Sequence, residues 1–226
     1  MRFNRLHNIF RLLAAVLLGG ILASSCQEHE YFPDYTLRVG NIYCQDGRII
    51  PPEVFDDKHD EPIGVIVALG ATEGALTYKA IAVGLDEWQA AISSRNQVFD
   101  GVGSGIDDMQ GRSNTASMLM AAMEDSTLSC PAAEYTTRFG KGDGSWYIPA
   151  CGELRHLSRV KETVLASFRL VGAKPLTDQW YVSSSQDDTS EATTELYNLN
   201  VSMSEGRVMS SGKTSVKIVR PFIVIQ

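Results

Sequence analysis

Residues 142–154 read Gly-Asp-Gly-Ser-Trp-Tyr-Ile-Pro-Ala-Cys-Gly-Glu-Leu, and this stretch decides how the chain folds. Its glycines predict a turn, Trp146 and Tyr147 a very short aromatic strand, and Pro149 the end of that strand and the start of a helix. Beyond the proline, apolar residues recur at spacings of three and four, which predicts a helix that ends before Gly172. These apolar residues are Leu154, Leu157, Val160, Val164, Leu165 and Phe168.

Before this stretch, four apolar runs predict two β-hairpins: residues 37–43 with 48–50, and residues 63–69 with 78–83. Asp46-Gly47 is a strong turn signal between the first two runs. The run 63–69 is nearly continuous in apolar residues, so we expect a central strand there. The following stretch, 85–91, is mixed, and we expect Trp88 to be a core anchor.

Two further helices are predicted at 113–124 and 131–139. Ser113 or Asn114 can cap the first, and Pro131 suits the first turn of the second. The last third of the chain predicts strands at 180–184, 196–203, 207–211 and 216–225, with Pro221 at a bulge or a sheet edge. Strands, then helices, then an antiparallel β meander indicate an α+β fold rather than a parallel doubly wound one.

The first 25 residues have the composition of a lipoprotein signal peptide. Three arginines precede an uncharged apolar run at 12–23, which is shorter than the roughly 20 residues of a membrane-spanning helix. Small residues stand directly before Cys26, as in the lipobox of bacterial lipoproteins. We therefore expect residues 1–25 to be removed and Cys26 to carry palmitate-like acyl chains that attach the protein to a membrane. An ordinary secretory signal with a chance cysteine is the alternative.

Residues 26–36 are polar and aromatic and show no periodic pattern of apolar residues, so we expect this segment to be a tether. The acidic run 27–30 is similar to the signal that sends some Gram-negative lipoproteins to the outer face of the outer membrane, although a solvated linker reads the same way. We expect surface display. About 190 residues follow the tether, enough for one domain with a sizeable core, and the prediction is a single domain at 37–226.

The charge balance bears on partners. Twenty basic and 27 acidic residues give a net charge of −7, and removal of residues 1–25, which hold three arginines and no acid, leaves 17 basic and 27 acidic residues and a net charge of −10. A surface this acidic repels phosphate backbones, so we expect no nucleic acid partner.

Three cysteines remain besides Cys26. Cys130 and Cys151 are the most plausible disulfide pair in an oxidising compartment, which would leave the thiol of Cys44 unpaired. Three small buried side chains are the other interpretation. The sequence does not decide between the two.

The stretch 143–154 resembles the Gly-x-Trp-x-Leu-Pro-(Ser/Thr)-x-x-Glu-Leu signature of the Lcl C-terminal domain family, which has a C-type-lectin-like fold in bacterial surface proteins. Family members also tend to carry Trp-Ser-Ser and Val-Arg-Pro, matched in order by residues 180–185 and 219–221. Weaker matches lie at 111–115 and 131–135. This chain departs from the signature at Ile148 and at Ala150-Cys151, and has Arg112 where an aromatic residue is usual.

The resemblance implies a C-type-lectin-like fold of antiparallel hairpins with two to three helices packed on them. Its motif residues also have structural explanations. Trp146 and Trp180 are expected as core anchors, Pro149 as the start of a helix, and Arg220 as the ion-pair partner of Glu153. The motif residues are Trp146, Pro149, Glu153, Leu154, Trp180, Ser183, Ser184, Arg220 and Pro221.

The resemblance also implies a binding face near the C-terminal hairpins, at 186–195 and 205–215. Both segments are polar and suited to hydrogen bonding a sugar or a protein, and solvated turns are the alternative. The candidate ligand contacts are Asp187, Asp188, Glu195 and Lys213.

Catalysis and cofactors have little support. The histidines are dispersed without zinc spacing, Ser210-Ser211-Gly212-Lys213 lacks companion motifs, and the glycines at 140–144 do not lead into a helix as a phosphate loop does. The formylglycine-generating enzyme has a related fold but needs a late cysteine pair, which this chain lacks. Asp107-Asp108 and Asp187-Asp188 could supply calcium ligands, although solvated acids are favoured. We expect no catalytic residue, no metal and no cofactor.

These observations predict a non-catalytic surface lipoprotein whose domain binds an extracellular glycan or protein, as an adhesin does. A structural accessory subunit of a pilus or envelope assembly is the alternative. Such a subunit should show a detachable terminal strand or an exposed sheet edge.

Overall fold

The computed structural model describes residues 33–70, 72–73, 76–140 and 144–226. Residues Asp34–Gln226 form one compact unit, and the description below concerns that unit. The expected signal peptide, Cys26 and most of the expected tether lie outside the described residues. Among the residues that are described, no helix is long and apolar enough to cross a membrane.

One sheet has six strands, in the spatial order β2-β1-β3-β6-β13-β8, and every neighbouring pair is antiparallel. The strands are β1 (Ile42–Cys44), β2 (Ile49–Ile50), β3 (Pro62–Leu69), β6 (Ala80–Gly84), β8 (Trp146–Tyr147) and β13 (Phe222–Ile225). Both predicted hairpins are confirmed in this sheet. The apolar run of β3 is central as expected, since β3 lies between β1 and β6. A small separate ladder pairs β4 (Thr72–Glu73) with β5 (Leu76–Thr77).

The second sheet has five strands, in the order β11-β10-β9-β12-β7. The strands are β7 (Trp88–Ala90), β9 (Trp180–Gln186), β10 (Tyr197–Ser202), β11 (Val208–Gly212) and β12 (Lys217–Val219). Its neighbours are antiparallel except β9 and β12, which run parallel. The meander predicted for the last third is thus confirmed for β9, β10 and β11. In this sheet β11 and β7 are the two edges.

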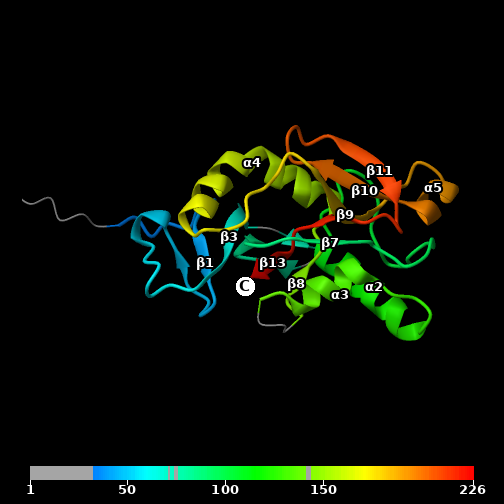
Figure 1. Ribbon diagram of the computed structural model, residues 1–226, viewed down its shortest axis with the longest axis horizontal. Coiled ribbons are helices and arrows are strands. Elements are labelled where there is room, and N and C mark those ends of the chain that lie inside the picture. Colours follow the sequence, from blue (N-terminus) through cyan, green and yellow to red (C-terminus); the bar gives the residue numbers. More distant parts are fainter. Residues whose placement is uncertain (1–32, 71, 74–75, 141–143) are drawn as a thin grey trace, which may run out of the picture. The chain divides into compact units, whose positions relative to one another are not determined.

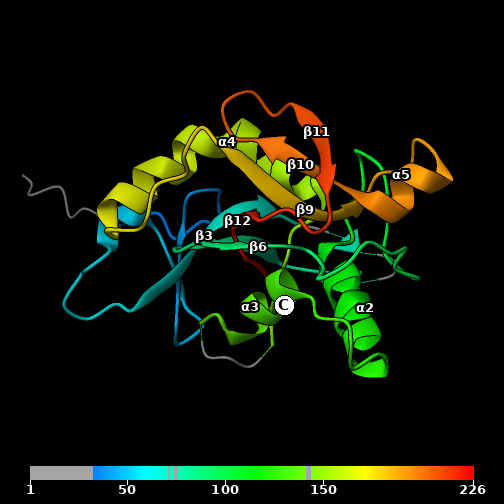
Figure 2. The ribbon, with the colours of Figure 1, turned by 45° about the vertical axis from the view of Figure 1, so that its right-hand side comes forward.

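The described helices are η1 (Pro52–Val54), α2 (Gly111–Glu124), α3 (Pro131–Arg138), α4 (Cys151–Leu170) and α5 (Glu191–Leu196). In Figures 1 and 2, α4 lies on one side of the strands, and α2 and α3 lie on the other. The apolar face predicted for α4 is buried, because Leu154, Leu157, Val164 and Phe168 join the main core with Val65 and Tyr181 from the two sheets. The fold is therefore α+β, as predicted.

The part of the opening stretch that the structure describes, residues 144–154, connects both sheets to α4. On one side, β8 pairs with β13 in the six-stranded sheet. On the other, the backbone carbonyl of Pro149 accepts a hydrogen bond from Ser184 N of β9 at 2.9 Å. At the start of α4, Glu153 Oε2 accepts from Ala150 N at 2.7 Å and Glu153 Oε1 accepts from the Tyr147 hydroxyl at 2.9 Å. This buried carboxylate satisfies a helix N-terminus that would otherwise lack acceptors.

The predicted strand 216–225 is two strands that belong to different sheets. It breaks at Arg220-Pro221, where β12 leaves the five-stranded sheet and β13 enters the six-stranded one. Proline has no N–H to give to a ladder, which explains the break, while its carbonyl accepts from Gly84 N at 2.8 Å. The expectation of one continuous strand with a bulge or an edge proline is corrected here.

The three cysteines in the described part of the chain, Cys44, Cys130 and Cys151, are free thiols, and all three are buried. Cys130 and Cys151 are thus small buried side chains, the second of the two interpretations that the sequence left open. Burial raises the pKa of Cys130 to about 11 and that of Cys151 to about 12, so both thiols are protonated at neutral pH.

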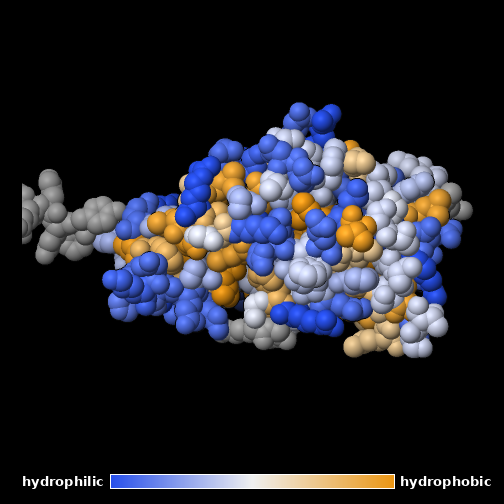
Figure 3. All heavy atoms as spheres, in the orientation of Figure 1, coloured by the Kyte–Doolittle hydropathy of each residue, from blue (hydrophilic) through white to orange (hydrophobic). Residues whose placement is uncertain are grey.

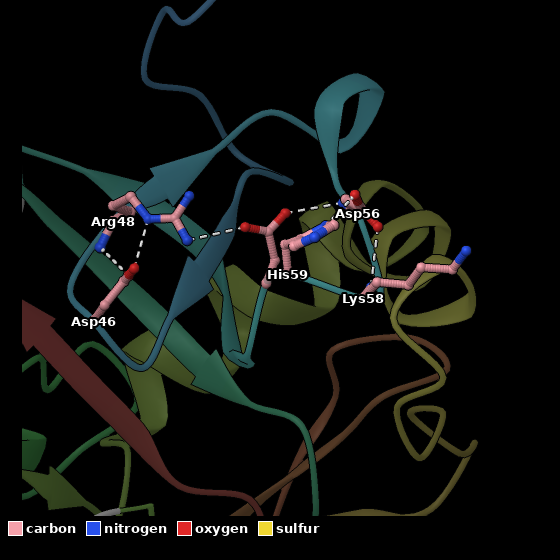
Figure 4. A network of polar contacts seen from close by, with 6 residues as sticks. Asp46, Arg48, Asp56, Lys58 and His59 are labelled. Carbon is pink, nitrogen blue, oxygen red and sulfur yellow. Dashed lines mark hydrogen bonds and ion pairs between the residues drawn. The ribbon is translucent and has the colours of Figure 1, made fainter.

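A polar network holds the first hairpin to the proline-rich loop that follows it (Figure 4). Arg48 bonds Asp46 at 2.5 Å and Asp60 at 2.9 Å, and the second Asp60 oxygen accepts from Asp56 N at 2.9 Å. His59 Nδ1 lies 2.6 Å from Asp56 Oδ2, and this hydrogen bond raises the pKa of His59. The side chains of His59 and Asp56 are solvent-exposed, so we assign this network a local structural role.

Candidate functional site

The candidate sites lie at the two edges of the five-stranded sheet, β11 and β7. β11 is bonded to β10 alone, over five residues in continuous register from Tyr197↔Gly212 to Val201↔Val208. Its residues, Val-Met-Ser-Ser-Gly, include no charge and no proline. Edge strands are usually protected by charges, prolines or bulges, because their free N–H and C=O groups can pair with another chain. β11 has none of these protections.

Lys213 directly follows β11 and points into the protein. Its side chain is fully buried, and Nζ donates to Gln97 O at 2.6 Å, Thr194 O at 2.6 Å and Gln186 Oε1 at 2.8 Å. It also lies 5.4 Å from the centre of the Phe99 ring. Burial lowers the pKa of Lys213 to about 8, against the opposing charge of Glu195. Lys213 therefore ties β11 to α5 and to the 97–99 loop, and its ammonium group has no hydrogen left for a ligand.

The four predicted ligand contacts separate into two kinds. Asp187 is 4% exposed. Its carboxylate accepts one hydrogen bond from Ser210 Oγ and another from Thr189 N, the second with a length of 3.0 Å. Burial alone would raise the pKa of Asp187, but these hydrogen bonds outweigh it and lower the pKa. Asp188 and Glu195 are exposed. The expectation that all four reach a ligand is thus corrected for Asp187 and Lys213, which are internal; for Asp188 and Glu195 it stays a prediction.

The opposite edge, β7, carries Trp88. Its side chain is 59% exposed, so the expectation that it anchors the core is wrong. Its ring stacks on Tyr135 of α3, with centroids 6.0 Å apart and planes 23° from parallel. Tyr135 contacts Phe139 edge-on, and Phe139 contacts the buried Trp146 at a centroid distance of 4.7 Å. An aromatic chain therefore runs from the core to an exposed indole.

A buried ion pair lies beside Trp88. Arg220 is fully buried, with one guanidinium nitrogen 3.3 Å from Glu87 Oε2 and its guanidinium carbon Cζ 5.1 Å from the centre of the Phe168 ring. Glu87 also accepts from the Tyr181 hydroxyl at 2.9 Å. Burial lowers the pKa of Arg220, and the charge of Glu87 opposes the shift. The expected partner of Arg220 was Glu153, which instead caps α4; Glu87 replaces it.

A surface hollow of about 360 Å³ adjoins this pair, lined by Glu87, Trp88, Gln89 and Lys174. Lys174 Nζ lies 3.5 Å from Glu87 Oε1, and the Lys174 carbonyl accepts from Arg220 at 2.7 Å. The hollow thus combines an aromatic face, an amide, a cation and a fixed carboxylate. On the face in Figure 3, apolar residues are interspersed with hydrophilic ones.

The motif residues hold the fold together. Trp146, Pro149, Leu154 and Pro221 are buried, whereas Trp180 is half-buried. The Ser183 hydroxyl donates to Leu199 O at 2.8 Å, and Ser184 Oγ accepts from Asn114 at 3.1 Å. The structural explanation given for these motifs from the sequence agrees with these contacts.

Three of the four acids considered for calcium, Asp107, Asp108 and Asp187, bond to other groups of the protein. Asp107 forms an ion pair with Arg155 at 2.7 Å, and Asp108 Oδ2 accepts from Asn114 and from Ser185, both at 2.7 Å. Within the described ranges, no three His, Cys, Asp or Glu side chains are grouped so that they could hold a metal ion.

Sequence reasoning missed the β7 hollow. Asp86-Glu87-Trp88-Gln89 shows no period, so the stretch gave no strand signal. The signal that the sequence did offer was the run Glu87-Trp88-Gln89, because an acid and an amide directly beside a tryptophan are uncommon in a core. The distant Lys174 could not be placed beside it without the fold.

Comparison with known proteins gives a structural likeness. No family model and no curated protein matches the chain. A solved structure with a similar fold is described as a fimbrial protein from Bacteroides ovatus ATCC 8483. The superposition has a TM-score of 0.66 at 15% sequence identity and covers 84% of this chain and 49% of that one. The chain thus spans about half the length of this neighbour, and the likeness shows a shared α+β fold.

Proposed function

We propose that this protein is a non-catalytic, exported accessory subunit of a fimbria or envelope assembly, and that it joins its neighbour by strand addition along β11. The observation that carries the proposal is the unprotected five-residue edge of β11, in a fold shared with a fimbrial protein. Added strands bind through main-chain hydrogen bonds, which need an open edge of this kind.

The described part of the chain fits an acceptor of a strand better than a donor. The last described strand, β13, lies between β6 and β8, and β1 lies between β2 and β3. Both are bonded on two sides, so release of either would disrupt the six-stranded sheet. On the evidence of these described strands, we propose that the partner supplies the extended segment and that this protein supplies the edge.

The same proposal includes attachment through Cys26, surface exposure on a Gram-negative outer membrane and membership of the Lcl C-terminal domain family with its C-type-lectin-like fold. The motif contacts described above support the family assignment, since Trp146, Pro149 and Ser184 join the two sheets at one point. The polar residues Asp188 and Glu195 are exposed and are further candidates for contacts with the partner.

The test places a charge on the edge strand of the full-length chain in its producing cell. Met209→Lys puts an ammonium on an exposed position of β11, and Val216→Lys puts one on an exposed position outside it. We expect Met209→Lys to lower the yield of cross-linked envelope complexes about tenfold, because a charged edge resists pairing, and Val216→Lys to leave it unchanged. Equal yields from both variants would overturn the β11 proposal.

A further inference from the structure

We propose that the hollow beside β7 binds a sugar ring of an extracellular glycan, with Trp88 as the stacking platform. This inference is independent of strand addition at β11, because the hollow lies at the other edge of the sheet. It rests on the exposure of Trp88, on the support beneath its ring and on the polar groups around it.

The exposed indole is held in place rather than free to rotate. Trp88 is fixed in its strand by pairing with Val219 of β12, and its ring stacks on Tyr135. Tyr135 is supported in turn by Phe139 and Trp146. A rigid aromatic platform binds a ligand face at low cost in conformational entropy, which is why Trp is favoured at recognition sites. The apolar C–H face of a pyranose ring is flat and suited to such a surface.

The groups around the indole match the hydroxyls of a sugar. Glu87 is a carboxylate acceptor fixed by Tyr181 and Arg220, Gln89 offers both a donor and an acceptor, and Lys174 offers donors. An apolar surface with a few convergent polar groups is typical of small-ligand sites, and about 360 Å³ is within their usual range.

Other ligand classes fit the hollow less well. A cationic ligand would meet the ammonium group of Lys174 at the hollow, and the carboxylate of Glu87 there is already paired with Lys174 and Arg220. A nucleic acid would be repelled by a chain of net charge −7. A neutral or weakly acidic sugar meets neither obstacle.

The test uses the intrinsic fluorescence of the full chain, titrated with hexasaccharides of glucose, N-acetylglucosamine, xylose and hyaluronan. A sugar that stacks on Trp88 changes its emission, and Trp88→Phe, which keeps a ring, should remove that change while affinity measured by calorimetry falls by less than about fivefold. Trp88→Ala should lower the affinity about tenfold or more. Tyr35→Ala, at another exposed aromatic, is the matched control and should bind as the unaltered chain does.

Gln89→Ala gives a second variant that leaves the aromatic stack in place, and we expect about a fivefold loss of affinity from the missing hydrogen bonds. Thermal unfolding of each variant checks that the fold is kept. The proposal is overturned if no hexasaccharide binds the unaltered chain, or if Trp88→Ala and Tyr35→Ala bind equally well.

Discussion

The two edges of the five-stranded sheet differ in what they present. β11 shows a continuous backbone edge with small, uncharged side chains, whereas β7 is three residues long and shows an indole supported by a chain of rings. A partner at β11 can be recognised through its main chain, and a partner at β7 through the shape and polarity of its surface. The two edges of one sheet thus present two different kinds of surface.

Each edge is also backed by a buried cation, and the two are satisfied differently. Lys213 beside β11 donates to three oxygens of neutral groups. Arg220 beside β7 faces the carboxylate of Glu87. Removal of a buried cation from an ion pair leaves a buried carboxylate without that partner. Removal of a buried cation that is bonded to neutral oxygens leaves only uncharged acceptors without a donor. The β7 side should therefore be the more sensitive of the two to substitution.

The largest expected effect is at the ion pair. Arg220→Met leaves the buried Glu87 carboxylate with only the half-exposed ammonium group of Lys174 as an ionic partner, and we expect the free energy of unfolding to fall by about 3 kcal/mol, measured by urea denaturation. The double variant with Glu87→Gln should recover part of this loss, since the buried carboxylate that lost its guanidinium is then replaced by a neutral amide. An equal loss in the single and double variants would show that the pairing itself contributes little.

A smaller loss is expected at Lys213. Lys213→Met removes the three hydrogen bonds of Nζ but also removes a charge whose burial is unfavourable, so we expect a decrease of about 2 kcal/mol in the free energy of unfolding. The same denaturation experiment measures it. If Lys213→Met costs more than Arg220→Met, the proposed difference between the two edges is wrong.

The pH dependence of stability separates the two cations further. The pKa of Lys213 is lowered to about 8 by burial, below its value in the unfolded chain, so above pH 8 the unfolded state binds more protons and this group makes stability rise with pH. Between pH 8 and 9, the unaltered chain should gain about 1 kcal/mol relative to Lys213→Met. The buried thiols titrate in both chains and cancel in the difference. A constant difference over this window would contradict the lowered pKa.

The smallest effects on stability are expected at the exposed side chains of the two edges. Met209→Lys should change the free energy of unfolding by less than about 0.5 kcal/mol, and Trp88→Ala should lower it by about 1 kcal/mol through the lost stacking on Tyr135. Each variant should lose one interaction only, assembly for Met209→Lys and sugar binding for Trp88→Ala. A variant that loses both would show that the edges are coupled.

Local patterns predicted most of the elements. The period of three and four residues in α4, the Asp46-Gly47 turn and the apolar run of β3 each depend on neighbours in the sequence, so they could be interpreted without the fold. Pro149 likewise marked the start of α4, which begins at Cys151. The α+β class followed from the order of these elements.

The parts that were not predicted depend on contacts between distant residues. Glu87 and Arg220 are more than 130 positions apart, and nothing local indicates that they meet. Lys213 and Asp187 look like loop residues by composition, yet their hydrogen bonds to other segments draw them inside. Trp88 looks like a core residue by type, but β7 is an edge strand and its tryptophan faces solvent.

The break of the last segment at Arg220-Pro221 has a mechanical meaning. Because β12 and β13 are consecutive, a short covalent connection runs from β12, between β9 and β7 in the five-stranded sheet, to β13, between β6 and β8 in the six-stranded sheet. Tension applied to β11 by a bound neighbour would pass through β10, β9 and β12 and then along the backbone into β13, so separation of the sheets requires that β13 be pulled from both of its neighbours at once. A force that separates the two sheets would therefore be resisted by the backbone hydrogen bonds of β13 as well as by side-chain packing.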